Sequence, residues 1–105
     1  MNDCIFCKIT NKEIPSTIRY EDENYLAFDD IDPKADLHIL IIPRVHIESV
    51  DELNDDNISV VADLTKIAKK LAKENKVKGY KLLINVGKEG GQIVFHLHMH
   101  LLGYN

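Results

Sequence analysis

Hydrophobic and polar residues alternate along several short stretches of the chain, and this alternation predicts β-strands. We expect the strands at 17–20, 25–28, 37–42, 80–85 and 94–102. The first two flank a polar turn at 21–24, so they should form a hairpin. Residues 37–42 are apolar at nearly every position, which is typical of a central strand covered on both faces.

A longer apolar pattern predicts one amphipathic helix from about Asp55 to Asn75. Asp55 or Asp56 would cap its start, and Gly79 would close the turn after it. Its apolar side chains sweep roughly 220°, whereas a single core-facing stripe needs little more than about 100°. We therefore expect part of this helix to contact a second copy of the chain; loops of the same chain are the alternative cover.

These elements define an α+β fold with a five-stranded antiparallel sheet, one long helix and a short N-terminal helix. The short helical turn is expected at 8–13, before Pro15 ends it. The chain of 105 residues has no repeat, linker or low-complexity segment, so we interpret residues 1–105 as a single domain.

Composition narrows the function. Hydrophobic residues make up 45% of the chain, which indicates a globular protein, and no apolar run reaches the roughly 20 residues that span a bilayer. Residues 1–4 lack the basic and apolar regions of a secretory signal, so we expect a cytoplasmic protein without a membrane partner. The net charge of −4 argues against nucleic acid as the main partner but allows a small phosphorylated ligand.

Three of the five histidines fall at His96, His98 and His100, alternating with large apolar residues. On a strand they would share one face while the apolar residues point into the core. A lone histidine is usually an ordinary surface or core residue, but a row of three needs a metal, a phosphate or a reaction to satisfy the rings. A metal bound by these three alone is awkward, because side chains two positions apart start nearly 7 Å apart on a strand.

The two cysteines form a C-x-x-C pair at Cys4 and Cys7. Without a signal peptide, this spacing suggests a metal site or a redox pair more than a structural disulfide, and two ordinary buried thiols are the alternative. Zinc requires four tetrahedral ligands, and His46 and His96 are the best further candidates.

The run from His96 to Leu102 resembles the signature of the histidine triad family. Residues 85–92 resemble the corresponding stretch of one branch of that family, the nucleotide-binding Hint-like proteins, which are purine nucleoside phosphoramidases. The likeness extends to Ile5–Phe6, to 38–47 and to Leu102–Gly103. It implies the family fold, a homodimer and a hydrolase that cleaves the P–N bond of purine nucleoside 5′-phosphoramidates through a covalent nucleotidyl-histidine. It also implies structural zinc and no organic cofactor.

The resemblance assigns roles to single residues. His98 matches the nucleophile, His100 the phosphate ligand and His38 the remaining site histidine, although His38 as a packed residue at a strand start is the alternative. The resemblance also implies four zinc ligands, two thiols and two imidazoles, namely Cys4, Cys7, His46 and His96.

The implied nucleotide site takes its base-stacking residues from the N-terminal half and its phosphate contacts from a glycine-rich loop. Asp30 would accept from the ribose hydroxyls. The remaining residues are Ile5, Phe6, Ile9, Phe28 and Ile31 around the base, and Asn85, Gly91, Gln92, Ile93, His98 and His100 around the phosphate. Without the resemblance, these apolar residues are simply core and the aspartates a solvated loop.

One position departs from the family pattern. Ile93 stands where many Hint-branch proteins carry serine, which bears on rate and leaving-group preference. Two other functions fit the same residues. One is dinucleoside polyphosphate hydrolysis, and the other is nucleotide-binding regulation with incidental turnover.

Overall fold

The protein is described by a computed structural model covering residues 3–105. Within that range the sheet order is β1-β2-β3-β5-β4, and all neighbouring strands are antiparallel. The strands are β1 (Ile18–Glu21), β2 (Tyr25–Asp29), β3 (Leu37–Pro43), β4 (Gly79–Leu83) and β5 (Met99–Tyr104). The helices are α1 (Ile5–Thr10), the 3-10 turn η1 (Val50–Glu52) and α2 (Ser59–Glu74). The predicted α+β class, with one long and one short α-helix, is confirmed.

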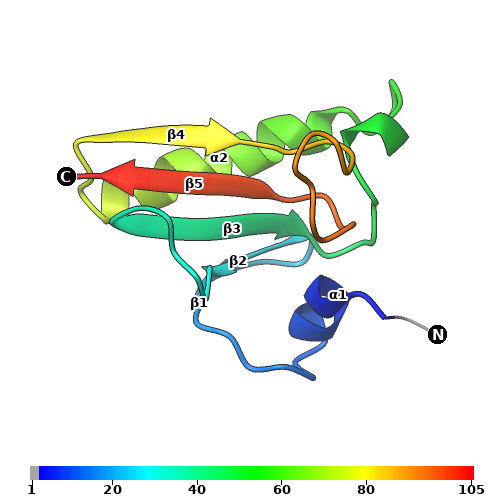
Figure 1. Ribbon diagram of the computed structural model, residues 1–105, viewed down its shortest axis with the longest axis horizontal. Coiled ribbons are helices and arrows are strands. Elements are labelled where there is room, and N and C mark those ends of the chain that lie inside the picture. The colour runs from blue at the N-terminus through cyan, green and yellow to red at the C-terminus, as the bar shows by residue number, and fades with distance from the viewer. Residues whose placement is uncertain (1–2) are drawn as a thin grey trace.

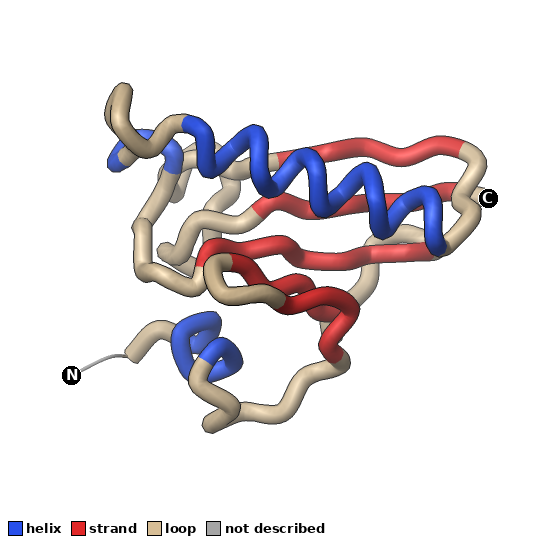
Figure 2. The backbone as a smooth tube through the Cα atoms, turned by 180° about the vertical axis from the view of Figure 1, so that it is seen from behind, coloured by secondary structure: helices blue, strands red, loops and turns tan. Residues whose placement is uncertain are grey.

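The central strand β3 separates two apolar layers (Figure 1). Ile39 and Ile41 lie in the cluster beneath α2, which crosses one face of the sheet in Figure 2. Leu40 and Ile42 lie in the opposite cluster with Phe6 of α1. The prediction that residues 37–42 form a strand covered on both faces is therefore confirmed.

The start of α2 differs from the expected start near Asp55. The side-chain Oδ1 of Asn54 accepts from the backbone N–H groups of Asp56 and Asn57, which holds 55–58 in a separate turn. Neither Asp55 nor Asp56 is the N-cap; that position falls to Ile58, which makes no side-chain capping bond. After the helix, Lys76 rather than Gly79 takes the left-handed conformation (φ 56°).

The apolar arc of α2 is covered more fully than the pattern indicated. Leu64, Ile67 and Leu71 are all buried in the cluster that α2 forms with the sheet of its own chain. They need no second copy to cover them. These three residues therefore do not support a dimer through this helix, whereas Ile58 and Ala62 of the predicted arc are exposed, and the homodimer stays a prediction.

The N-terminal helix begins three residues earlier than expected. The Sγ atom of Cys4 accepts from the backbone N–H of Cys7 at 3.4 Å, so a thiol caps the helix. Apolar Ile5 and Phe6 then form its first turn. Neither α-helix in the described part of the chain combines the length and apolar character needed to cross a bilayer.

The last strand begins at Met99 rather than at Val94. The backbone N–H of Leu97 donates to the carbonyl of Ile47, which ties residues before β5 to the segment after β3 instead of to a neighbouring strand. The alternation of faces nevertheless persists, because Leu97, Met99 and Leu101 are all buried beneath α2.

Candidate functional site

The site residues gather on the face of the sheet opposite α2, where α1 packs. His100 on β5 pairs with Leu40 on β3, and His38 on β3 pairs with Leu102 on β5. Both pairs involve even-numbered residues, whose side chains share the face of the second apolar cluster. The two histidines therefore meet across the two central strands.

His98 presents one ring nitrogen with a free lone pair. Its Nδ1 lies 2.7 Å from the carbonyl oxygen of His96. A carbonyl only accepts, so Nδ1 of His98 carries the proton and Nε2 keeps the lone pair. The ring of Phe6 contacts it edge-on, with ring centroids 5.0 Å apart. Burial lowers the pKa of His98, so the imidazole is neutral at pH 7.

His38 and His100 form a chain of oriented hydrogen bonds. The backbone N–H of Lys34 donates to Nδ1 of His38 at 3.1 Å. A neutral His38 therefore carries its proton on Nε2, which donates to Nδ1 of His100 at 2.9 Å. His100 in turn carries its proton on Nε2, so a neutral imidazole becomes a directed donor.

Electrostatics favours these neutral forms. Burial, together with the neighbouring His98 and His38, lowers the pKa of His100 to about 4. Burial also lowers the pKa of His38, although the carboxylate of Asp30, 3.4 Å from its Nε2, opposes the shift. The three rings therefore offer a lone pair and a donor rather than fixed positive charge.

A second cluster lies where α1 meets the segments after β3 and before β5. The ligand atoms of Cys4, Cys7, His46 and His96 lie within 4.8 Å of one another. Nδ1 of His96 is 3.3 Å from the Cys4 sulfur and 3.5 Å from the Cys7 sulfur. Nδ1 of His46 is 3.3 Å from the Cys7 sulfur. The structure thus brings together all four predicted ligands.

The donor set fits a metal ion of the zinc type. The Nε2 of His96 lies 2.7 Å from the carbonyl of Pro43 and so donates its proton there, leaving the Nδ1 lone pair facing the sulfurs. Tetrahedral zinc would hold S and N ligands about 3.6 Å apart, only slightly more than the separations found. Burial raises the pKa of Cys4, so metal binding would release its proton.

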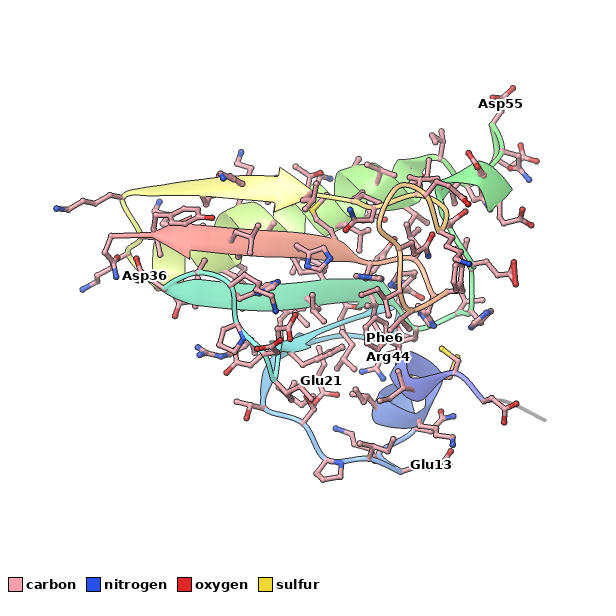
Figure 3. All side chains as sticks on the ribbon, in the orientation of Figure 1. Phe6, Glu13, Glu21, Asp36, Arg44 and Asp55 are labelled. Atoms are coloured by element: carbon pink, nitrogen blue, oxygen red, sulfur yellow. The ribbon has the colours of Figure 1, made fainter. Side chains whose placement is uncertain are left out.

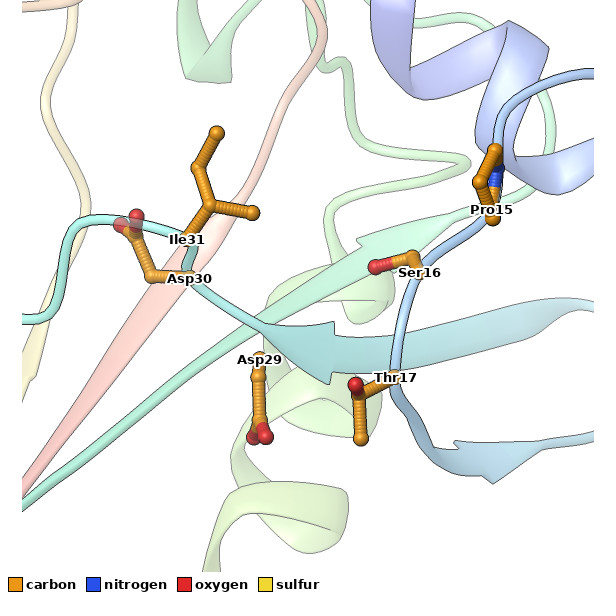
Figure 4. Close-up of a pocket in the computed structure, with 6 residues that line it drawn as sticks. All are labelled: Pro15, Ser16, Thr17, Asp29, Asp30 and Ile31. Carbon is orange, nitrogen blue, oxygen red and sulfur yellow. The ribbon is translucent and has the colours of Figure 1, made fainter.

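A pocket of about 380 Å³ opens beside the histidines. Its walls include nearly all of the predicted nucleotide-binding residues, namely Ile5, Phe6, Ile9, Phe28, Asp30, Ile31, Asn85, Gly91, Ile93, His98 and His100. Two of the residues predicted to stack on the base differ in burial: Phe28 is part of the core, whereas Ile31 is 95% exposed. Figure 4 shows Asp30 and Ile31 opposite Pro15 and Ser16. All four residues border both this pocket and an adjoining shallow hollow.

The glycine-rich loop is braced internally. Gln92 does not line the pocket: its side-chain amide donates to the carbonyls of Glu48 and Val94, and its Oε1 accepts from the N–H of Gly87. The backbone N–H of Gln92 also donates to Gly87, so this group is already engaged, contrary to the expectation that it faces phosphate. Gly91 (φ 92°) borders the pocket with Asn85 beside it.

Several groups that build the site carry no signal in the sequence. The carbonyls of Pro43 and His96 and the N–H of Lys34 set the protonated nitrogen of each histidine. These are backbone groups: every residue type supplies the carbonyl, and every type except proline supplies the N–H. Asp30 was predicted as a ribose ligand, and the structure also places it against His38.

Comparisons with known proteins agree with this geometry. The profile of the family described as scavenger mRNA decapping enzyme C-term binding matches residues 3–105. The chain is 44% identical to Protein HitA of Neisseria gonorrhoeae over 98% of this chain and 97% of that one. It is 42% identical to the purine nucleoside phosphoramidase of Escherichia coli K12, over 96% and 87% of the two chains. A solved HIT family hydrolase from Clostridium thermocellum superposes with a TM-score of 0.94 at 50% identity, covering 98% and 91%.

This chain therefore belongs to the histidine triad (HIT) family. A hydrolase-named structural neighbour and a phosphoramidase-named relative together support hydrolase activity on a nucleotide.

Proposed function

We propose that this protein hydrolyses purine nucleoside 5′-phosphoramidates, with His98 as the nucleophile. The observation that carries the proposal is the hydrogen bond from Nδ1 of His98 to the carbonyl of His96. It leaves the Nε2 lone pair on a neutral, buried imidazole that lines the pocket, and an imidazole in that state is an effective nucleophile. The purine phosphoramidase name of a 42% identical relative supports the substrate class.

The reaction divides into two displacements at phosphorus. The Nε2 lone pair of His98 bonds to the α-phosphorus while the P–N bond to the amine breaks. The amine nitrogen keeps that electron pair and takes a proton from solvent. Water then attacks the same phosphorus, the His98–phosphorus bond breaks, and the proton that water loses returns to solvent. The carbonyl of His96 stabilises the positive charge that His98 carries as the nucleotidyl intermediate.

His100 and Asp30 complete the site in this proposal. The Nε2–H of His100 would donate to a phosphate oxygen, oriented by the chain of hydrogen bonds from Lys34 through His38. Asp30 would accept from the ribose, which selects nucleotides over other phosphoramidates.

Turnover with two substrates separates this reaction from its alternatives. We expect adenosine 5′-phosphoramidate to release AMP much faster than a diadenosine polyphosphate does. Faster cleavage of the polyphosphate would favour the dinucleotide hydrolase, and tight nucleotide binding with negligible turnover of either would favour the regulator. A nucleotide trapped covalently on His98 after a quench in alkaline denaturant, which preserves the acid-labile P–N bond, would establish the intermediate by mass spectrometry.

We further propose that Cys4, Cys7, His46 and His96 hold a structural zinc ion. Four protein ligands leave no open coordination position, so the ion would tie the N-terminal helix to the triad segment without taking part in the reaction. Elemental analysis of protein purified without added metal should give about one zinc per chain.

We also propose a homodimer, supported by the edge strand β4. All five of its residues are exposed, and among them are Tyr80, Leu82 and Leu83. An exposed apolar edge strand is a template for pairing with another chain, and a two-fold dimer is the commonest oligomer. Light scattering at micromolar concentration should report about twice the 12.0 kDa of one chain. Leu83→Lys should shift the protein toward monomer, and wild-type protein that already runs as a monomer would contradict the proposal.

A further inference from the structure

A second hollow, of about 460 Å³, lies beside the nucleotide pocket and shares its wall. Ile5, Ile93 and Val94 border both spaces. A ligand whose phosphate and nucleoside fill the first pocket can therefore extend across these three residues into the second. The hollow lies near the N-terminal end of α1, the end at which the chain begins in Figure 1.

The lining of this hollow includes two acidic side chains. Asp3 and Glu48, both exposed, line it, and no lysine or arginine does so within the described part of the chain. Its other polar residues, Cys4 and His46, belong to the metal-binding cluster.

The apolar side chains around the hollow are open to solvent. Ile93 is 89% exposed, Phe95 45% and Ile5 44%. Single exposed apolar residues need no explanation, but three around one hollow that continues an active-site pocket form a surface suited to a hydrocarbon chain. Figure 3 shows Phe6, next in sequence to Ile5, beside the end of β3; Phe6 borders the nucleotide pocket but not this hollow.

We propose that this hollow binds the departing amine and selects amines in which an apolar stem ends in a second positive charge, such as a linear diamine. The inference rests on the proposed phosphoramidate hydrolysis. The methylene stem would lie on Ile5, Ile93 and Phe95, while the terminal ammonium group faces Asp3 and Glu48. In this assignment Ile93 is a specificity-determining residue, because it forms the wall between the phosphate and the stem.

Paired substrates test the proposal. Adenosine 5′-phosphoramidates of hexylamine and of 1,5-diaminopentane have stems of equal length, and they differ in ending with a methyl or an ammonium group. We expect a higher kcat/KM for the diamine derivative. Each exposed carboxylate should contribute about a two- to fivefold preference, the size typical of solvent-exposed ion pairs. The preference should shrink as salt is raised from 20 mM to 500 mM, because exposed charges are screened.

Charge-neutral variants locate the effect. Asp3→Asn and Glu48→Gln should each reduce the preference for the diamine and leave kcat/KM for the hexylamine derivative unchanged. Glu23→Gln removes an exposed carboxylate from the β1–β2 turn, outside the hollow, and should change neither value.

The outcomes distinguish the two proposals. If neither phosphoramidate is hydrolysed, the proposed function fails. If both are hydrolysed equally well, or if the preference survives in the Asp3→Asn/Glu48→Gln double variant, the leaving-group site is refuted while the proposed function stands.

Discussion

His96 and His98 are the same residue type, two positions apart, yet different ring nitrogens carry the proton in each. His96 donates from Nε2 to the carbonyl of Pro43, so its Nδ1 lone pair faces two sulfurs. His98 donates from Nδ1 to the carbonyl of His96, so its Nε2 lone pair faces the nucleotide pocket. The position of one backbone carbonyl decides which nitrogen of each ring is available.

In the proposed function, this difference divides the site into a structural half, around His96, and a reacting half, around His98. The cluster around His96 joins three distant segments of chain, as a structural metal site does. The rings around His98 are held neutral by burial and aimed by hydrogen bonds at a pocket. Removing a residue from the first half should cost stability, and removing one from the second should cost turnover.

The largest effect is expected at His98. His98→Ala removes the nucleophile, so turnover of adenosine phosphoramidate should fall by several orders of magnitude while the thermal unfolding temperature changes little. Single-turnover AMP release and a melting curve measure the two quantities. Wild-type turnover in His98→Ala, together with lost activity in fully folded His96→Ala, would reverse the division between the halves.

A smaller loss is expected at His100. His100→Ala removes a donor to the phosphate but leaves the attack possible, so kcat should fall by about 10² to 10³. His38→Ala should have a lesser effect in the same direction, because it removes only the group that orients His100. Lys34→Ala is the matched control: it keeps the backbone N–H that orients His38, and its kcat should stay near wild type.

The structural half is tested by Cys7→Ser. This variant should lose its metal and about 4 kcal/mol or more of unfolding free energy, the range seen when a metal site is destroyed. Metal analysis and denaturant unfolding provide the measurements, with His38→Ala as a variant that should retain the metal. Molecules of Cys7→Ser that remain folded should still turn over substrate. Wild-type protein that is as stable without metal as with it would contradict a structural metal site.

The smallest effect concerns pH. Burial lowers the pKa of His100 to about 4, below its ordinary value of 6.5, and lowers that of His98 as well. Both groups are therefore neutral in the folded protein at a pH where free histidine is half charged. We expect the acid limb of kcat to be centred below pH 6.5, because both reacting rings stay neutral below the ordinary pKa of histidine. An acid limb centred at 6.5 would show that the reacting rings are not held neutral.

The same shift bears on stability. Between the ordinary pKa and the lowered one, the unfolded chain binds more protons than the folded chain. The contribution of His100 to unfolding free energy is thus fully present above about pH 6.5 and is lost as pH falls toward 4. Urea unfolding at pH 7.5 and pH 5 should show the decrease, and the decrease should be smaller in His100→Ala.

The sequence predicted the architecture, and its resemblance to the family predicted most of the residues that the structure brings together in the two halves. Period-two alternation identified the strands, and the apolar run at 37–42 identified the central one, because burial on two faces leaves little room for polar residues. The spacing of Cys4 and Cys7 and the row from His96 to His100 marked the chemistry, since those residue types are costly to place together without a function.

Only the tertiary structure decided how each residue is used. Leu64, Ile67 and Leu71 of α2 are covered by the sheet of the same chain, which a helical wheel does not show because it contains no information about neighbours. The thiol of Cys4 capped α1, and Asn54 displaced the expected aspartate cap of α2. The reactive nitrogen of each histidine depended on carbonyl and amide groups supplied by Pro43, His96 and Lys34. Those groups are common to nearly all residue types, so their effect arises from where the folded backbone places them.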